Sequence, residues 1–282
     1  MRVTVAGFLT DHKSRVLLRQ IDRATLAPVH RELTVGTSPV AALAAAFREE
    51  TGLVVLPVRP TGVYADSAAR ALTVCYRCTL RGGDLKPPAG QPMAGFFDAR
   101  PLPRGLNAAD RQSLDDALHH AGGPVRLARR PAGAGARLQR LLSRPESADP
   151  AVGWSAIARL IVDAGEAGIL WAQTGAGGLW RLPATPVSAG EAPWEAAAAL
   201  LSRLKVTPGA EPALRLIEIA VDRPALDFVF AVVPATPITP AQAAGDLTLA
   251  RPGGADAAFD AADSALAREV LVEEAITIRL AS

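Results

Sequence analysis

Residues 36–53 read GTSPVAALAAAFREETGL, and this stretch decides the fold of the first half of the chain. Ser38 and Pro39 predict the start of a helix, with serine as the cap and proline at the first helical position. Gly52 predicts its end, because glycine readily adopts the left-handed conformation that closes many helices. One apolar face is expected from four residues at helical spacing, Val40, Leu43, Ala44 and Phe47.

Two acidic residues end this helix. At about 100° per residue, Glu49 points away from the apolar face and Glu50 lies at its edge. A carboxylate at position 46 would lie between them, and all three would converge on one cation. Hard cations such as Mg²⁺ take oxygen ligands of this kind and share them with substrate phosphates. Position 46 is Ala46, so two of three ligands remain. The alternative interpretation is that both glutamates are solvated surface charges.

The two halves of the chain resemble each other at an offset of 154 residues. At this offset Val3–Leu9 lies on Ile157–Asp163, and Val16-Leu17 lies on Leu170-Trp171. Gly36 lies on Gly190. Both halves show the same order of elements, namely strand, strand, glycine loop, helix, strand and strand. The pattern predicts a duplication.

The join between the halves is basic. Residues 117–145 contain no acidic residue and include arginines at positions 126, 129, 130, 137, 140 and 144. Residues 131–135, Pro-Ala-Gly-Ala-Gly, have a flexible composition. We expect a linker over residues 122–153 whose arginines remain solvated. A basic patch for an anionic ligand or nucleic acid is the alternative, but it is disfavoured because no aromatic residues alternate with the arginines.

The composition narrows the class of protein. The chain has 282 residues, 21% of them charged, and a formal net charge of +2, which excludes a strongly basic nucleic-acid coat protein. The longest apolar runs, residues 41–47 and 228–235, fall short of the roughly 20 residues that cross a bilayer. Two cysteines exclude a disulfide framework. The expectation is a cytoplasmic protein without a membrane partner.

The stretch from Gly36 to Leu53 resembles the Nudix box, G-x5-E-x7-R-E-U-x-E-E-x-G-U, in which U is aliphatic. Phe47 stands at an aliphatic position, Glu49 and Glu50 stand at the acidic pair, and Gly52 with Leu53 closes the motif. Phe96-Phe97-Asp98, followed by Leu102-Pro103, is similar to the usual ending of the family. The resemblance covers residues 1–121.

The first half departs from the box at several positions. Arg31 stands at the first glycine, Thr37 at the first glutamate, and Ala45-Ala46 at the arginine–glutamate pair. In the family the glutamate of that pair is usually a metal ligand. Three acids elsewhere in this half are candidates to replace it, Asp66, Asp84 and Asp98.

The second half resembles the same family more faintly. Trp180-Arg181-Leu182-Pro183 followed by Gly190-Glu191 is similar to the entry to the box. Leu200, Arg203 and Leu204 stand where the carboxylates belong, so no site residue is expected in this copy.

The resemblance implies an α/β (α+β) Nudix-like fold, a mixed sheet between helices, duplicated in tandem. The first domain would span residues 1–121 with the partial box, and the second would span residues 154–282. The implied activity is Mg²⁺- or Mn²⁺-dependent hydrolysis of a nucleoside diphosphate linked to another group, with the metal and the catalysis at Glu49 and Glu50. The alternative is an inactive protein of the same fold that binds a nucleotide or metabolite. The family also implies an intramolecular pseudo-dimer or a homodimer.

Overall fold

A computed structural model describes residues 1–68, 70–87, 89–90, 92–122, 124–130, 153–173, 178–238, 246–252, 259–272 and 276–281. The chain divides into two compact units. Unit 1 is built mainly from Met1–Trp154, and unit 2 from Ser155–Ala220 and Ala225–Ala281. Among the described residues, no helix is both long and apolar enough to cross a membrane.

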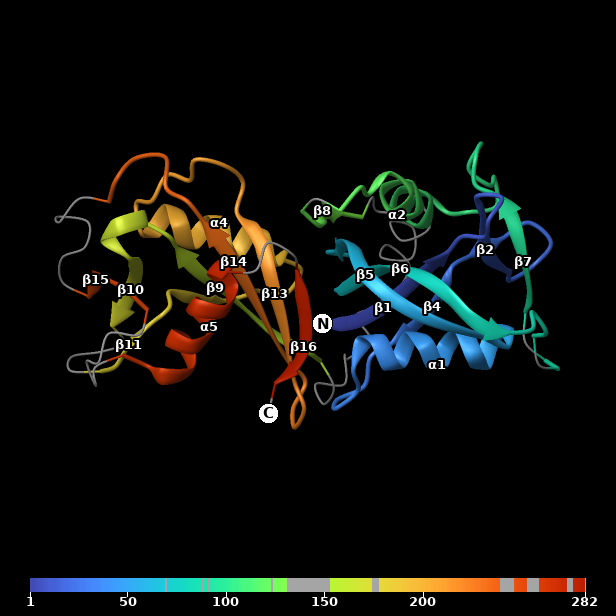
Figure 1. The fold of residues 1–282 in the computed structure, drawn as a ribbon, viewed down its shortest axis with the longest axis horizontal. Helices are drawn as coiled ribbons and strands as arrows, with labels where there is room; N and C mark the ends of the chain where they lie inside the picture. Colours follow the sequence, from blue (N-terminus) through green and yellow to red (C-terminus); the bar gives the residue numbers. More distant parts are fainter. Residues whose placement is uncertain are drawn as a thin grey trace, which may run out of the picture. The chain divides into compact units, whose positions relative to one another are not determined.

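The described residues of unit 1 form two sheets and two helices (Figure 1). Its five-stranded sheet has the order β4-β1-β6-β5-β8, and its three-stranded sheet has the order β3-β2-β7. Strand β1 is antiparallel to β4 and parallel to β6, so the larger sheet is mixed. The elements are β1 (Arg2–Leu9), β2 (Arg15–Gln20), β3 (Leu26–Ala27), β4 (Val29–Glu32), α1 (Pro39–Thr51), β5 (Leu53–Asp66), β6 (Ala71–Gly83), β7 (Met93–Asp98), α2 (Ala108–His119) and β8 (Arg126–Arg129).

The larger sheet of unit 1 lies between α1 and α2 (Figure 1). Neighbouring residues of a strand point to opposite faces, and β1 shows both sides. Ala6 belongs to the core cluster that includes Leu114 of α2. Gly7 faces α1, and a Cβ at this position would lie 2.6 Å from the Phe47 ring. Glycine therefore allows the helix that carries the two glutamates to approach the sheet closely.

Unit 2 has the same architecture (Figure 1). Its sheets have the orders β12-β9-β14-β13-β16 and β11-β10-β15, which repeat the orders of unit 1 strand for strand. The predicted fold class, a mixed sheet between helices duplicated in tandem, is confirmed. The elements are β9 (Ser155–Val162), the short 3-10 helix η2 (Gly165–Ala167), β10 (Ile169–Gln173), β11 (Trp180–Arg181), β12 (Ala184–Pro186), α4 (Pro193–Arg203), β13 (Ala213–Ala220), β14 (Ala225–Val232), β15 (Leu247–Ala250), α5 (Ala261–Val272) and β16 (Thr277–Ala281).

Strand pairing corrects the alignment of the two halves. Arg19 pairs with Ala27 in unit 1, and Ala172 pairs with Arg181 in unit 2. The offset is therefore 153 residues through the first two strands and 154 from β3 to β6, because one residue is inserted between β10 and β11. It returns to 153 before α2, where Leu106 and Phe259 form the equivalent bridges to Leu26 and Trp180. The predicted single offset was wrong for the first two strands, and Val3 corresponds to Ala156 instead of Ile157. Both Val3 and Ala156 are buried, whereas Ile157 is exposed.

Part of the segment that we expected to be a linker is a strand. β8 adds to the edge of the larger sheet of unit 1 by parallel pairing with β5. Residues 131–152, which include the Pro-Ala-Gly-Ala-Gly sequence and the last three arginines, lie outside the described residues.

Candidate functional site

The two glutamates of the box both contact arginines that come from distant strands. Arg31 of β4 donates to Glu49 Oε2 at 2.5 Å and lies 3.8 Å from Glu50 Oε1. Arg19 of β2 contacts Glu50 Oε2 through Nη1 at 2.6 Å. Arg31 occupies the position of the first box glycine, so a guanidinium stands where the motif has no side chain. The carboxylates thus already have cationic partners within the chain.

Burial separates the two pairs energetically. The Arg31 and Glu49 side chains are 37% and 58% exposed, and exposed pairs contribute about 0–1 kcal/mol. The Arg19 and Glu50 side chains are only 9% and 11% exposed. Removing one partner of a buried pair costs about 3–5 kcal/mol, because the other charge is left without compensation. Glu50 is therefore held much more firmly than Glu49.

The buried face of α1 differs from the predicted one. It consists of Pro39, Ala42, Leu43, Ala46, Phe47, Glu50 and Thr51. Ala44 is only half-buried, and Ala46 is fully buried. Glu50 belongs to the buried face, whereas we expected it at the edge. The position of the missing third ligand consequently lies inside the helix–sheet interface.

The remaining motif residues have structural roles. Gly52 ends α1 at a φ of +79°, and a Cβ there would lie 2.6 Å from the Asp84 carbonyl oxygen. Phe47 is fully buried, and Leu53 begins β5 opposite Gly83. Gly36, at a φ of +77°, lies in the loop before α1. Ser38 occupies the cap position without a side-chain hydrogen bond to the helix.

The described residues do not fit a divalent metal ion. None of them forms a group of three or more histidine, cysteine, aspartate and glutamate side chains that would hold one. The candidate replacements lie elsewhere. Asp66 lines the pocket on the α2 side of the sheet, Asp98 lines a second pocket, and Asp84 is exposed, 3.6 Å from Lys86. Glu49 and Glu50 thus have arginine partners and no third carboxylate.

A pocket of about 480 Å³ lies next to Arg31 on the side of the sheet that faces α2. This volume falls within the usual range of ligand sites, roughly 300–1,000 Å³. The lining includes arginines and carboxylates in equal number, Arg2, Arg31 and Arg130 against Glu32, Asp66 and Asp110. We call it the polar pocket. A ligand that offers both hydrogen-bond donors and acceptors would match such a lining.

One end of the polar pocket is ordered by the start of α2. Asn107 caps the helix by accepting from the Asp110 backbone N–H at 2.8 Å, and its amide donates to Asp110 Oδ2 at 2.7 Å. Arg130 lies 3.7 Å from Asp110 Oδ1 and over the Tyr64 ring. Its buried Nε has no hydrogen-bond partner among the described residues. This N–H is therefore a buried donor that the described residues leave unpaired.

The equivalent positions in unit 2 are filled. Ala6, Thr73 and Asp110 correspond to Arg159, Asp227 and Asp263. Arg159 contacts both aspartates at 2.6 Å, and the Leu182 backbone N–H donates to Asp263 at 2.9 Å. Burial raises the pKa of Asp227 and Asp263, and the neighbouring guanidinium opposes this effect. A buried ion cluster thus replaces the small side chains that leave space in unit 1.

In unit 2 the helix also contacts the strand at this place, but here the helix residue is the hydrogen-bond donor and the strand residue is the acceptor. Thr185 and Arg203 stand at the positions of Arg31 and Glu49, and Arg203 Nη2 donates to Thr185 Oγ1 at 2.9 Å. The strand and the helix therefore touch at the same place in both units. In unit 2 the helix supplies the cation.

The residues predicted for the site did not include Arg19, Arg130 or Asp110. Arg19 reaches Glu50 from a strand 31 positions earlier, and no local spacing signals such a pair. Asp110 lies three residues after the helix-capping Asn107. This spacing predicts the capping contact, but it does not predict that Asp110 lines a pocket. Arg31 did carry a signal, because it stood at a glycine position of the motif.

The chain was compared with known proteins. No protein-family model matches it, and no curated protein does. Solved structures similar to part of it include an ADP-ribose pyrophosphatase from Streptococcus suis, at 20% identity over 45% of this chain and 98% of that chain, with a TM-score of 0.37. A Nudix hydrolase from Nitrosomonas europaea is similar at 18% identity over 45% and 77%, with a TM-score of 0.39. A mutator MutT protein from Bacillus halodurans is similar at 17% identity over 45% and 86%, with a TM-score of 0.38. Slightly less than half of this chain is thus similar to solved structures of Nudix hydrolases, among others.

Proposed function

We propose that unit 1 binds a small nucleotide or diphosphate ligand in the polar pocket and does not hydrolyse it by the metal mechanism of the Nudix box. The observation that carries this proposal is the pairing of both box glutamates with Arg19 and Arg31. A divalent ion would have to displace a buried guanidinium from Glu50 and would still lack the third carboxylate at position 46.

The lining of the polar pocket supports the class of ligand. Nucleotides carry hydrogen-bond donors and acceptors on the base and negative charge on the phosphates. Carboxylates such as Asp110 accept from donors, while Arg130 and Arg31 donate and attract anions. The protein would then act as a sensor or as an interaction module whose state depends on the ligand.

Hydrolysis is the second candidate, and one observation favours it. Glu49 is 58% exposed and its pair with Arg31 is weak, so this carboxylate exchanges partners easily. Mg²⁺ or Mn²⁺, the metals implied by the resemblance, would then use Glu49 together with groups of the substrate. We derive no catalytic step from this arrangement, because the described residues supply too few ligands.

Binding is tested by calorimetry with ADP-ribose in the presence of EDTA, which removes any metal contribution. We expect binding to the wild-type chain. Replacing Arg130 by glutamine should weaken it about tenfold or more, because a charge-assisted hydrogen bond is lost. Arg126→Gln is the matched control, since Arg126 is an exposed arginine of the neighbouring strand outside the pocket lining. Equal effects of the two substitutions would contradict the assignment of the pocket.

Hydrolysis is tested by phosphate or nucleotide release from a panel of nucleoside diphosphate derivatives with Mg²⁺ or Mn²⁺. The wild type is compared with the double variant Glu49→Gln/Glu50→Gln. We expect no turnover above the blank. Metal-dependent turnover that disappears in the double variant would overturn the binding-only proposal and assign the partial box as an active site.

A further inference from the structure

A second cavity of unit 1 lies at the other end of the space between the larger sheet and α2. Its volume is about 400 Å³, and its lining includes Phe8 near the end of β1 and Leu118 near the end of α2. The polar pocket instead involves Thr4 of β1 and Asp110 of α2. We call the second cavity the Phe8 pocket. None of its lining residues contributes to the site described above.

The Phe8 pocket carries a surplus of positive charge. Lys13, Arg77 and Arg100 line it together with one carboxylate, Asp98, which leaves two positive charges in excess. All three cations are exposed, and within the described part of the chain none of them has a carboxylate partner. Arg100 Nη2 lies 3.1 Å from His119 Nε2, a ring nitrogen that accepts when the histidine is neutral. Asp98 thus offsets one of the three positive charges without forming an ion pair with any of them.

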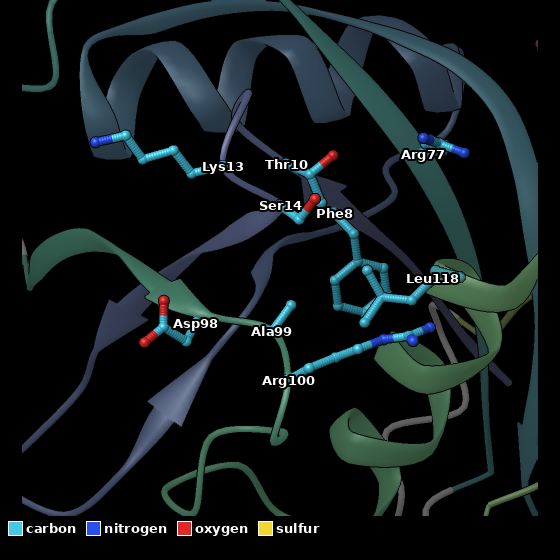
Figure 2. Close-up of a pocket in the computed structure, with 10 residues that line it drawn as sticks. Phe8, Thr10, Lys13, Ser14, Arg77, Asp98, Ala99, Arg100 and Leu118 are labelled. Carbon is cyan, nitrogen blue, oxygen red and sulfur yellow. The ribbon is translucent and has the colours of Figure 1, made fainter.

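Figure 2 shows how the charged groups are distributed around the opening. In this view Lys13 and Asp98 lie on one side, and Arg77 and Arg100 lie on the other side with Leu118. In the same view the Phe8 ring is near the middle, and the hydroxyl groups of Thr10 and Ser14 are drawn above it. Phe8 and Ala99 are 2% and 3% exposed, so the floor is apolar and is fixed by the core. An apolar floor beside two arginines suits a ligand with one apolar end and one anionic end.

Unit 2 provides an internal comparison for this set of residues. Thr10 corresponds to Asp163, because both form the same isolated bridge to the following strand. At the same offset Lys13 corresponds to Glu166, and Arg77 corresponds to Ala231 through the pairing of the central strands. The duplicated fold thus carries a carboxylate at the position of Lys13 and a neutral side chain at the position of Arg77. The fold itself does not require the cations of unit 1.

We propose that the Phe8 pocket is a second ligand site, specific for a small organic phosphate monoester with an aromatic or apolar group. A phosphate monoester carries about two negative charges near neutral pH, which equals the surplus of the pocket. Arginine recognises phosphate through paired N–H groups, and the hydroxyls of Thr10 and Ser14 add donors. The apolar group would contact Phe8 and Leu118. This site is independent of the polar pocket and of its proposed ligand.

The proposal is tested on the full chain by calorimetry with phenyl phosphate and with AMP, with inorganic phosphate as a reference. We expect phenyl phosphate to bind more tightly than inorganic phosphate. The double variant Arg77→Gln/Arg100→Gln should weaken binding by roughly 100-fold or more, because each charged hydrogen bond is worth roughly 10- to 100-fold in affinity. Arg81→Gln is the matched control, since Arg81 is exposed on the same strand outside the pocket lining.

A nuclear magnetic resonance readout locates the bound anion. The His120 ring lies close enough to Arg77 for that charge to act on it. Phenyl phosphate should raise the midpoint of the His120 titration in the wild type and leave it unchanged in the double variant. Both exposed arginines lie outside the core, so the double variant is expected to keep its fold, which its amide spectrum will verify.

Three outcomes would overturn the proposal. They are the absence of phenyl phosphate binding at millimolar concentration, equal affinity for phenyl phosphate and inorganic phosphate, and equal loss in the Arg77/Arg100 and Arg81 variants. Arg130→Gln separates this site from the polar pocket. Loss of phenyl phosphate binding in that variant would place the ligand in the polar pocket instead, while failure of ADP-ribose binding alone would leave the Phe8 pocket unaffected.

Discussion

Replacing Arg19 by methionine tests how strongly the buried pair with Glu50 stabilises unit 1. At 2.6 Å and an effective dielectric constant of about 20, the Coulomb attraction of the pair is about 6 kcal/mol before desolvation. Desolvation offsets most of this attraction in the intact pair. The substitution leaves Glu50 buried with only Arg31 nearby, at 3.8 Å. We therefore expect unit 1 to lose about 3 kcal/mol of stability, the lower end of the range for broken buried pairs.

The double variant Arg19→Met/Glu50→Gln should lose less stability than Arg19→Met alone. With both charges removed, neither is left uncompensated, and the loss should fall to about 1 kcal/mol or less. The difference defines a coupling free energy of at least about 2 kcal/mol in a double-mutant cycle. The cycle of Arg31→Gln and Glu49→Gln is the control, because that exposed pair should give less than about 1 kcal/mol.

Hydrogen exchange is the suitable assay, because a chain of two units does not unfold in a single two-state transition. Amides of α1 and β2 report on unit 1, and amides of β13 and β14 report on unit 2. A loss of about 3 kcal/mol corresponds to roughly 100-fold faster exchange of the protected amides in unit 1. Additive losses in the double variant, or an Arg19→Met effect no larger than that of Arg31→Gln, would refute the reasoning.

Three further predictions follow from the structure. The double substitution Ala6→Arg/Thr73→Asp copies the residues of unit 2 into the polar pocket of unit 1. It should abolish ADP-ribose binding measured by calorimetry and leave the far-ultraviolet circular dichroism spectrum unchanged. Retained binding would contradict the placement of the ligand. Gly52→Ala should cost about 2 kcal/mol or more in denaturant unfolding, because its left-handed backbone and the Asp84 carbonyl disfavour a Cβ, whereas Gly82→Ala, with open space around it, should cost less than half as much. Burial, together with the positive charges of Arg59 and Arg77, lowers the pKa of His120 below its usual 6.5, so the stability that the neutral ring contributes is present above pH 6.5 and lost as pH falls through the folded-state pKa. A nuclear magnetic resonance midpoint at or above 6.5, or an unchanged pH dependence of unfolding in His120→Asn, would contradict this sign.

The order of elements was readable from the sequence because strong local signals mark it. Gly52 at the end of α1 and the apolar alternation of the central strands fix the type of each element, and the similar halves reinforce each other. The change of offset was not readable, because it arises from one residue between β10 and β11. The strand pairing reveals it, for example between Ala172 and Arg181.

The buried face of α1 was less predictable for a compositional reason. Five of its residues between positions 41 and 46 are alanines, so hydrophobic contrast around the helix is weak and two neighbouring faces fit the pattern equally well. Glu50 belongs to the buried face only because Arg19 neutralises it there. That contact joins residues far apart in the sequence, and charge type alone does not identify such partners.

The ion cluster of Arg159 with Asp227 and Asp263 has a consequence for stoichiometry. A duplicated fold ordinarily offers two equivalent sites, and saturation would then take two equivalents of ligand per chain. Here the cluster fills the second position with an arginine that contacts both aspartates. The titration of the polar pocket should therefore reach its end point at one equivalent per chain, with a Hill coefficient of one.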